Sequence, residues 1–393
     1  MIFAIYQAVL NVDCFIFTYN DTQKVDINNT HVVAVVTQAG FDRYMNKNID
    51  QAFQDLYKLK FPDIYLNQAG ISLTLQDLHL GNFKSSKMKS ILMNQSGYVE
   101  FKDFEFDFQF NFKFQQLTYP YIQDSGEGSM LTRNTSFTLG LDVQLSTDCP
   151  HHIDVASFYQ SSHIDRLELH LSGQFEFLYD FVISFLQELL KDFCNSYFTR
   201  QLIDIVVRAM GSDIWKKKLI SLSNSDHSLF FDQRWTKISV DSQMIRVFSP
   251  GFMCFRVQNE LKCAHYNQQQ FKYLVTNADT QYKFHRKSVE SIFRFINEVE
   301  KQNFQLVQMA NTGILVINSG QTFLVKLKWK RFDNSLVHSY IWFVMQVSNM
   351  LQGGGEEEIN KILEKYPLSY NNGNGIVDCW FMYGEYIDAG CNQ

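Results

Sequence analysis

The sequence lacks the long apolar runs and short signature motifs that would assign it at once to several large protein classes. No stretch of 18 apolar residues occurs in the chain, so no helix is expected to span a membrane. No CxxC pair or Cys/His array has the spacing of a zinc site. The strings GxSxG, HExxH and GxxxxGK are also absent. We therefore expect no enzyme activity, no metal and no cofactor.

The sequence also carries little net charge. Lysine and arginine number 35 against 41 acidic residues, a net charge of −6, which argues against a nucleic-acid binder or a strongly cationic membrane-attacking protein. Hydrophobic residues make up 46%, close to the globular norm, which argues against disordered and fibrous classes. Proline is scarce at 5 residues, whereas phenylalanine reaches 36 and tyrosine 19. Part of this aromatic excess can reflect genome composition.

The N-terminus and the cysteines bear on the compartment. Residues 2–18 are apolar enough for a signal-peptide core, but they lack a basic start and include Gln7 and Asp13. A cleaved leader within residues 1–30 and a structured start both stay open. Cleavage would remove Cys14 and leave six cysteines, which can pair completely. N-glycosylation sequons begin at Asn20, Asn28, Asn94 and Asn134. Together these features favour the extracellular space or the secretory-pathway lumen.

The most unusual stretch is FEFDFQFNFKF, at residues 104–114. Its even-numbered positions are all Phe and its odd-numbered positions are polar, which is the two-residue period of a strand with one apolar face. Two interpretations of that face stay open. The phenylalanines either fill an ordinary core, as aromatics at strand spacing usually do, or they line a groove that holds an acyl chain.

Further strands are expected on both sides of this stretch. ISLTLQDLHL (71–80) shifts its apolar parity after Asp77, which indicates a bulge. FTLGLDVQL (137–145) and HIDRLELHL (163–171) each predict one strand, and DSGEGS (124–129) predicts the turn before the former. Because these runs are close in sequence, they predict an antiparallel meander.

Two helices are expected in the first half. After a strand at 31–38, apolar residues at three- and four-residue spacing predict a helix over 41–56 that Pro62 ends. A second apolar stripe predicts a helix from 177 to 210, roughly 50 Å long. The string CNSYFT (194–199) is a place where this helix could break.

The second half has weaker signals. Strands are expected at 271–278, 313–317, 322–329 and 380–390, and helices at 291–302 and 358–366. We place a domain boundary near 245–265, which gives an N-terminal module of residues 31–250 and a C-terminal module of residues 265–393.

Several strings, in one order, carry a resemblance to a known family. They are VVAVVTQAGFDRYMN (32–46), LKFPDIYL (59–66), SLFFD (228–232), KISVDSQMIRVFSPG (237–251), LVQMANTGILVINSGQTFLVKLKWK (306–330), INKILEKYPLSY (359–370) and GIVDCWFMYGEYI (375–387). In this order they resemble the family of bactericidal/permeability-increasing protein, lipopolysaccharide-binding protein and the plasma lipid-transfer proteins. The likeness covers residues 30–250 and, in pieces, 300–391.

The resemblance implies an α+β fold of two elongated modules. Each module is a twisted antiparallel sheet wrapped on a long helix and holds a lipid, and the second module is shortened here. The resemblance also implies a disulfide between Cys149 and Cys194, although the residues alone also allow two free buried thiols. The pairs Cys254 with Cys263 and Cys379 with Cys391 are further candidates.

The resemblance and the apolar stripes together predict a lipid site. Acyl chains gain about 0.8 kcal/mol per buried CH₂, so a carrier needs a long dry groove rather than polar anchors. The residues expected to line the groove are Phe41, Met45, Phe53, Phe104, Phe106, Phe108, Phe110, Phe112, Phe181, Phe185 and Leu189.

The expected function is non-catalytic binding or transfer of phospholipid or another acyl lipid. The expected partners are lipids, lipid aggregates or membrane surfaces, and no nucleic acid. One alternative is a protein of innate defence or surface recognition that binds lipopolysaccharide or microbial lipid without transfer, and a lipid esterase is a third hypothesis. The antibacterial members have a strongly cationic N-terminal tip, whereas the hairpin here reads QDSGEGS (123–129) and is acidic. This departure argues against lipopolysaccharide binding and bacterial killing.

Overall fold

The computed structural model describes most of the chain between residues 30 and 392. The described residues are 30–53, 57, 61–68, 70–84, 88–145, 153–173, 183, 187, 190–192, 194–198, 200, 220–221, 229–232, 235–257, 260–263, 277–334, 338–350, 355–366, 370–372 and 378–392. Residues 2–18, the candidate leader, lie outside them. Within these ranges, no helix is both long and apolar enough to cross a bilayer.

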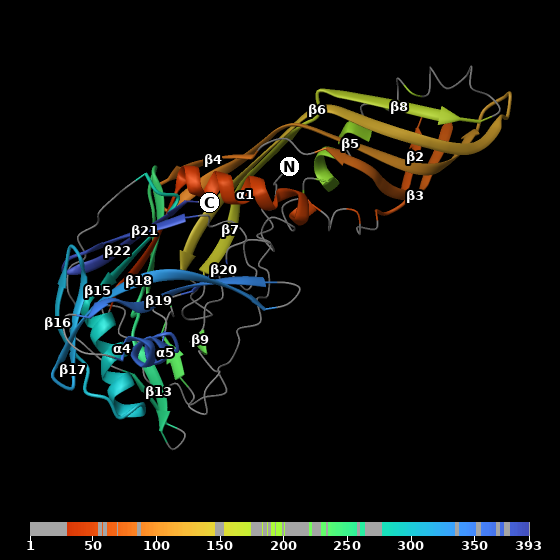
Figure 1. The fold of residues 1–393 in the computed structure, drawn as a ribbon. Helices are drawn as coiled ribbons and strands as arrows, with labels where there is room; N and C mark the ends of the chain where they lie inside the picture. Colours follow the sequence, from red (N-terminus) through yellow and green to blue (C-terminus); the bar gives the residue numbers. More distant parts are fainter. Residues whose placement is uncertain are drawn as a thin grey trace.

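A long antiparallel sheet forms an arm (Figure 1). Its strands are β2 (Ile64–Gln68), β3 (Ile71–Lys84), β4 (Met88–Met93), β5 (Ser96–Gln116), β6 (Gln123–Leu145), β7 (Ile153–His163) and β8 (Arg166–Ser172). The order is β2-β3-β5-β6-β7, with β4 also paired to β5 and β8 to β6. The predicted antiparallel meander is confirmed.

Two bulges set which residues of the arm face inward. The register of β3 against β5 shifts between Gln76 and His79, and Asp77 has a φ of 55°. The bulge predicted at Asp77 is therefore confirmed. A second bulge in β5, where Asp103 also has a φ of 55°, moves the buried parity from Phe101 to Phe104. Asp tolerates this left-handed conformation better than bulky residues do.

The turn predicted at residues 124–129 is wrong, because this segment belongs to strand β6. Its glycines serve packing rather than turning. A Cβ on Gly128 would lie 2.3 Å from a ring carbon of Phe110 and 2.9 Å from Leu171. A glycine inside a strand often marks such a close approach, and sequence alone does not distinguish it from a turn residue.

Two other predicted strands are each divided in two. The predicted strand at 163–171 is the end of β7 and all but the last residue of β8, with buried Ile164 between them. The predicted final strand is a hairpin of β21 (Asp378–Tyr383) and β22 (Tyr386–Asn392), with Gly384 in its turn. For the strand expected at 271–278, residues 271–276 lie outside the described part, and Asn277–Ala278 are not in a strand.

A central sheet joins the arm to the second half of the chain. Its order is β11 (Lys237–Val240), β12 (Met244–Ser249), β1 (Val32–Thr37), β15 (Thr280–His285), β22 and β21. Helix α1 (Gln38–Phe53) follows β1 directly, and the Thr37 hydroxyl accepts a hydrogen bond from the Gly40 amide at 3.1 Å, as an N-cap does. This helix agrees with the one predicted at 41–56 but begins three residues earlier.

Two further sheets and two helices make up most of the rest of the described chain. One sheet has the order β16 (Gln305–Ala310), β17 (Gly313–Asn318), β18 (Gln321–Asn334), β19 (His338–Met350) and β20 (Tyr370–Asn372). The other has the order β14 (Glu260–Cys263), β13 (Met253–Val257), β10 (Leu229–Phe231) and β9 (Ile220–Ser221). Helices α4 (Arg286–Val299) and α5 (Glu356–Leu363) lie in this part, away from the arm (Figure 1). The division into modules of residues 31–250 and 265–393 stays a prediction.

An ion pair and a group of packed rings lie at the junction between β1 and β15. The Arg43 guanidinium of α1 pairs with the buried Asp279, with Nε 2.7 Å from Oδ2. The fully buried His31 ring packs on Phe252 at 4.5 Å and edge-on to His285 at 5.2 Å between ring centroids. The seam is therefore held by charge pairing and ring packing as well as by the strand ladder.

The close approach at Gly128 predicts a stability effect. Gly128→Ala should lower the free energy of unfolding by about 1–3 kcal/mol, because the new methyl group overpacks a filled core. Gly384→Ala is the control, since a Cβ there meets nothing nearer than 4.0 Å. Thermal unfolding followed by circular dichroism measures both, and equal melting temperatures for the two variants would contradict the packing role of Gly128.

The cap of α4 predicts acid sensitivity. The His285 Nδ1 accepts a hydrogen bond from the Lys287 amide at 3.1 Å, which requires a neutral ring. Burial lowers the pKa of His285 below 6.5, with Lys287 and Arg286 acting in the same direction against Glu290 and Glu385. The unfolded chain thus takes up the proton more readily, and this contribution to stability is present above about pH 6.5 and lost as the pH falls.

His285→Asn tests this prediction, because Asn caps a helix without titrating. Chemical denaturation between pH 7.5 and 5 should show a smaller acid-induced loss of stability in the variant than in the unsubstituted protein. The same loss in both proteins would assign the acid effect to other groups.

Candidate functional site

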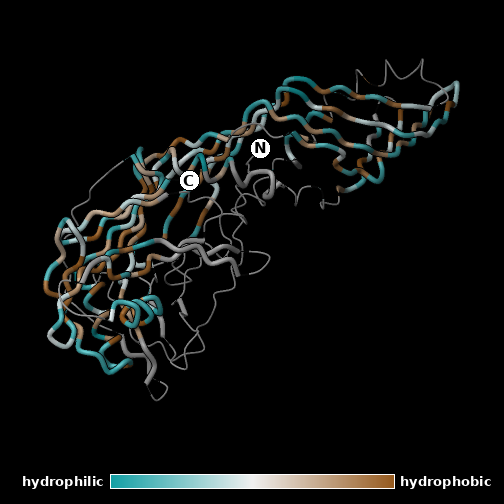
Figure 2. Tube along the Cα trace, in the orientation of Figure 1, coloured by the Kyte–Doolittle hydropathy of each residue, from teal (hydrophilic) through white to brown (hydrophobic). Residues whose placement is uncertain are grey.

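The candidate site is a row of phenylalanines along β5, which we call the aromatic wall. It consists of Phe104, Phe106, Phe108, Phe110, Phe112 and Phe114, all between 1% and 5% exposed. The intervening Gln109, Asn111 and Lys113 are exposed, so the predicted inward and outward faces are confirmed. Polar and apolar residues alternate along the arm in Figure 2. Every ring of the wall therefore points to one side of the sheet.

Neighbouring strands extend the wall sideways with aliphatic groups. Across β3, Leu75 is paired with Phe112 and Leu80 with Phe108. Across β6, Met130 is paired with Phe108. Phe106 packs edge-on against Phe108, with ring centroids 5.3 Å apart. The face of the sheet is thus largely apolar over three strands, with the buried Thr132 and Thr135 of β6 opposite Phe106 and Phe104.

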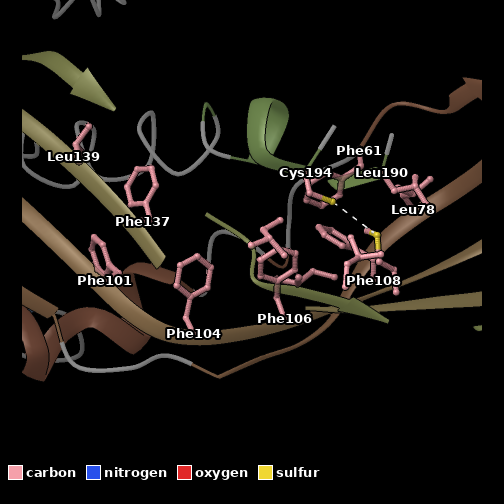
Figure 3. Packing of buried hydrophobic residues seen from close by; sticks show 14 of the residues in the cluster. Phe61, Leu78, Phe101, Phe104, Phe106, Phe108, Phe137, Leu139, Leu190 and Cys194 are labelled. Atoms are coloured by element: carbon pink, nitrogen blue, oxygen red, sulfur yellow. Dashed lines mark hydrogen bonds between the residues drawn. The ribbon is translucent and has the colours of Figure 1, made fainter. Parts of the chain in front are cut away.

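A second layer covers part of this face. Phe61 stands edge-on to Phe108, with centroids 4.8 Å apart, and Leu190 and Cys194 lie beside this pair (Figure 3). Leu190 is 0% exposed and belongs to the same apolar cluster. Residues 190–192 are helical, and a π-helical turn follows at Cys194–Phe198. CNSYFT (194–199) is the string at which the predicted helix could break.

The covering helical residues are attached to the strands by side chains. The Ser162 hydroxyl donates to the Asn195 carbonyl at 3.1 Å. The Gln187 amide donates to the Leu167 carbonyl at 3.2 Å. The Lys191 ammonium donates to the Asp165 carbonyl at 3.3 Å. These contacts place the segment across β7 and β8.

The predicted lining residues have different outcomes. Phe104 to Phe112 lie together in the wall, and Phe41 is buried in the same apolar cluster, with Met45 packed against it. Phe53 lies in α1, but its side chain is outside the described part, as are Phe181, Phe185 and Leu189 entirely. Whether any of these side chains touches a lipid stays a prediction.

Sequence reasoning missed several members of the site. Phe61, Met130, Leu190 and Cys194 contact or adjoin the wall through tertiary structure. Phe61 stands before the helix-ending Pro62 and Met130 follows a Gly/Ser-rich run, so local pattern gave no signal for either. Leu190 was part of the long-helix stripe but was not selected from it.

The cysteines differ from the pairing that the resemblance implied. Cys194 is a free buried thiol, so the predicted disulfide between Cys149 and Cys194 is wrong. The Cys194 Sγ lies 3.8 Å from the Met130 sulfur. Cys149 lies outside the described residues. A disulfide joins Cys379 and Cys391 across β21 and β22, which confirms that candidate pair.

The site has the chemistry of a hydrocarbon surface. The buried members of the cluster around the wall are aliphatic and aromatic side chains, with the thiol of Cys194. Among the described residues, no group of three or more His, Cys, Asp or Glu is arranged to hold a metal ion. Such a surface binds apolar ligands through the area it removes from water.

Comparison with known proteins gives a likeness of fold. No protein-family model matches the sequence, and no curated protein does. The crystal structure of lipopolysaccharide binding protein is similar with a TM-score of 0.63 and 13% identity, covering 93% of this chain and 99% of that chain. Takeout 1 from Epiphyas postvittana matches with a TM-score of 0.29 and 13% identity over 42% of this chain and 87% of that chain. The chain thus shares the elongated antiparallel fold of lipopolysaccharide binding protein. The long helix wrapped by each sheet stays a prediction.

Burial of Cys194 predicts an inert thiol. Desolvation raises the pKa of Cys194 to about 12, so little thiolate forms near neutral pH. In reduced protein, a maleimide reagent should label Cys194 only after denaturation, as peptide mass spectrometry can measure. Rapid labelling of Cys194 in the native protein would show that the layer over the wall opens readily.

Proposed function

We propose that this chain binds the acyl part of a phospholipid or another lipid against the aromatic wall, without catalysis. The observation that carries the proposal is the wall itself: six Phe in one row, continued by aliphatic residues of β3 and β6 under a helical layer. The fold shared with lipopolysaccharide binding protein over 93% of the chain supports it. Burial of each CH₂ contributes about 0.8 kcal/mol, so a long apolar face suffices for affinity.

A bound chain must displace part of what covers the wall. Phe106 and Phe112 are each 1% exposed, so their rings are already in contact with protein. The sheet beneath is held by continuous backbone ladders, whereas the described attachments of the covering segment are side-chain hydrogen bonds. Each such bond has a net value of about 0.5–1.5 kcal/mol. We infer that the lipid enters between the sheet and the helical layer.

Transfer between membranes is the finer form of the proposal. The alternative is recognition of a lipid-bearing surface without transfer. Movement of lipid from donor to acceptor vesicles should occur only in the first case. The family resemblance covers residues 30–250 continuously but residues 300–391 only in pieces, and on this basis we propose one lipid per chain. The Cys379–Cys391 disulfide supports placement in an oxidising compartment such as the secretory pathway.

The direct experiment is native mass spectrometry with organic extraction of protein from a eukaryotic secretory host. We expect a co-purifying lipid and uptake of a fluorescent phospholipid at one per chain. Neither lipid nor uptake would overturn the proposal, and a ratio of two would show a second site in the C-terminal half.

A pair of matched variants assigns the site. Leu190 beside the wall and Leu363 in α5 are both 0% exposed. Leu190→Trp should overpack the contact between the sheet and the helical layer and reduce lipid uptake about fivefold or more, since overpacking costs about 1–3 kcal/mol. Leu363→Trp should cost similar stability but leave uptake unchanged. Equal lipid uptake by the two variants would show that the lipid does not bind at the aromatic wall.

A further inference from the structure

The loop between β5 and β6 exposes more aromatic surface than any other described segment. Tyr119 is 87% exposed and Tyr121 75%, and Leu117 beside them is 42% exposed. The loop lies where β5 ends and β6 begins, at the tip of the arm far from α4 and α5 (Figure 1). Large apolar groups at a projecting end are usual where a protein meets another apolar surface.

Backbone hydrogen bonds and an apolar contact hold the base of the loop. The Leu117 amide donates to the Gly70 carbonyl at 2.7 Å, and the Gln116 amide donates to the Ile122 carbonyl at 2.8 Å. Ile122 packs against the apolar cluster of the arm. The two tyrosines therefore project from a fixed base, and ordering them on contact costs little conformational entropy.

The charges around the loop restrict the kind of surface that it can bind. Lys113 is the one Lys or Arg in 61–82 and 113–132, whereas these stretches include Asp63, Asp77, Asp124 and Glu127. Anionic lipid attracts clusters of basic residues, and this tip has none in those stretches. A tyrosine ring has an apolar body and a polar hydroxyl, and such rings gather at the level of lipid headgroups.

We propose that Leu117, Tyr119 and Tyr121 form an insertion tip that docks the arm onto an uncharged, zwitterionic lipid surface. This proposal rests on the proposed function, for which it names the partner surface. Phe114, the outermost ring of the aromatic wall, precedes Leu117 by three residues. An acyl chain taken up at the tip would therefore meet the wall directly.

The test is flotation of the full chain with phosphatidylcholine vesicles, alone or mixed with phosphatidylglycerol. We expect binding to the pure phosphatidylcholine vesicles, no gain from phosphatidylglycerol and little change with salt. The partition coefficient of the double variant Tyr119→Ser, Tyr121→Ser on these vesicles should be at least about tenfold lower, because two rings no longer bury apolar area in the lipid.

Tyr159→Ser is the matched control. Tyr159 is also an exposed aromatic of the arm, at 46%, but it lies on β7, away from the tip. This variant should bind vesicles as the unsubstituted protein does. Equal binding by the tip variant and the control would overturn the proposal, and so would binding that requires phosphatidylglycerol. Light scattering completes the test: a dimer that only the tip variant loses would assign the loop to a second copy of the chain and overturn the proposal as well.

Uptake of fluorescent phospholipid delivered from dilute detergent separates this proposal from the proposed function. The tip variant should retain that uptake, since the aromatic wall is intact. If the unsubstituted protein takes up no lipid but floats through its tip, the proposed function fails and the insertion tip stands. If uptake occurs but flotation is independent of the two tyrosines, the insertion tip fails and the lipid site stands.

Discussion

Pairing of β5 along both of its edges is the constraint on which the arm depends. A strand hydrogen-bonded to β3 and β4 on one side and to β6 on the other cannot rotate about its axis. All its even-numbered rings from Phe104 onward must therefore lie on one face. The neighbouring strands match this row of rings. The bulge of β3 at Asp77 keeps its leucines on the same face as the rings. In β6, Gly128 stands where a Cβ would clash with the Phe110 ring.

The two layers at the wall differ in how they are held. The sheet is a continuous ladder of backbone hydrogen bonds, and opening it would break many bonds together. The described contacts of the covering segment are side-chain bonds from Ser162, Gln187 and Lys191 and apolar contacts around Leu190. Apolar contacts lose little when a hydrocarbon chain replaces a side chain, because both fill the same dry space. In the proposed function, the wall exchanges protein contacts for lipid contacts at a modest net cost.

The central sheet connects the two halves of the chain, and a titratable ring lies at the connection. Strand β1 belongs to the first half and β15 to the second, and they pair directly. Arg43 and Asp279, with the rings of His31 and His285, lie at this junction. The ring of His285 also caps α4. A change in its charge therefore acts on the junction and on the first turn of a helix together.

Local pattern determined much of this architecture. The two-residue period of the Phe stretch assigned the inner and outer faces of β5, the parity change marked the bulge at Asp77, and helical spacing located α1, α4 and α5. These features depend on residues close together in the chain, which the sequence displays. Tertiary structure alone decided the rest: that residues 124–129 continue a strand, that Cys194 lies against Met130 as a free thiol, and that Leu117, Tyr119 and Tyr121 project from the tip of the arm. Such features depend on which distant residues share a space, and that is set by packing across strands rather than by order along the chain.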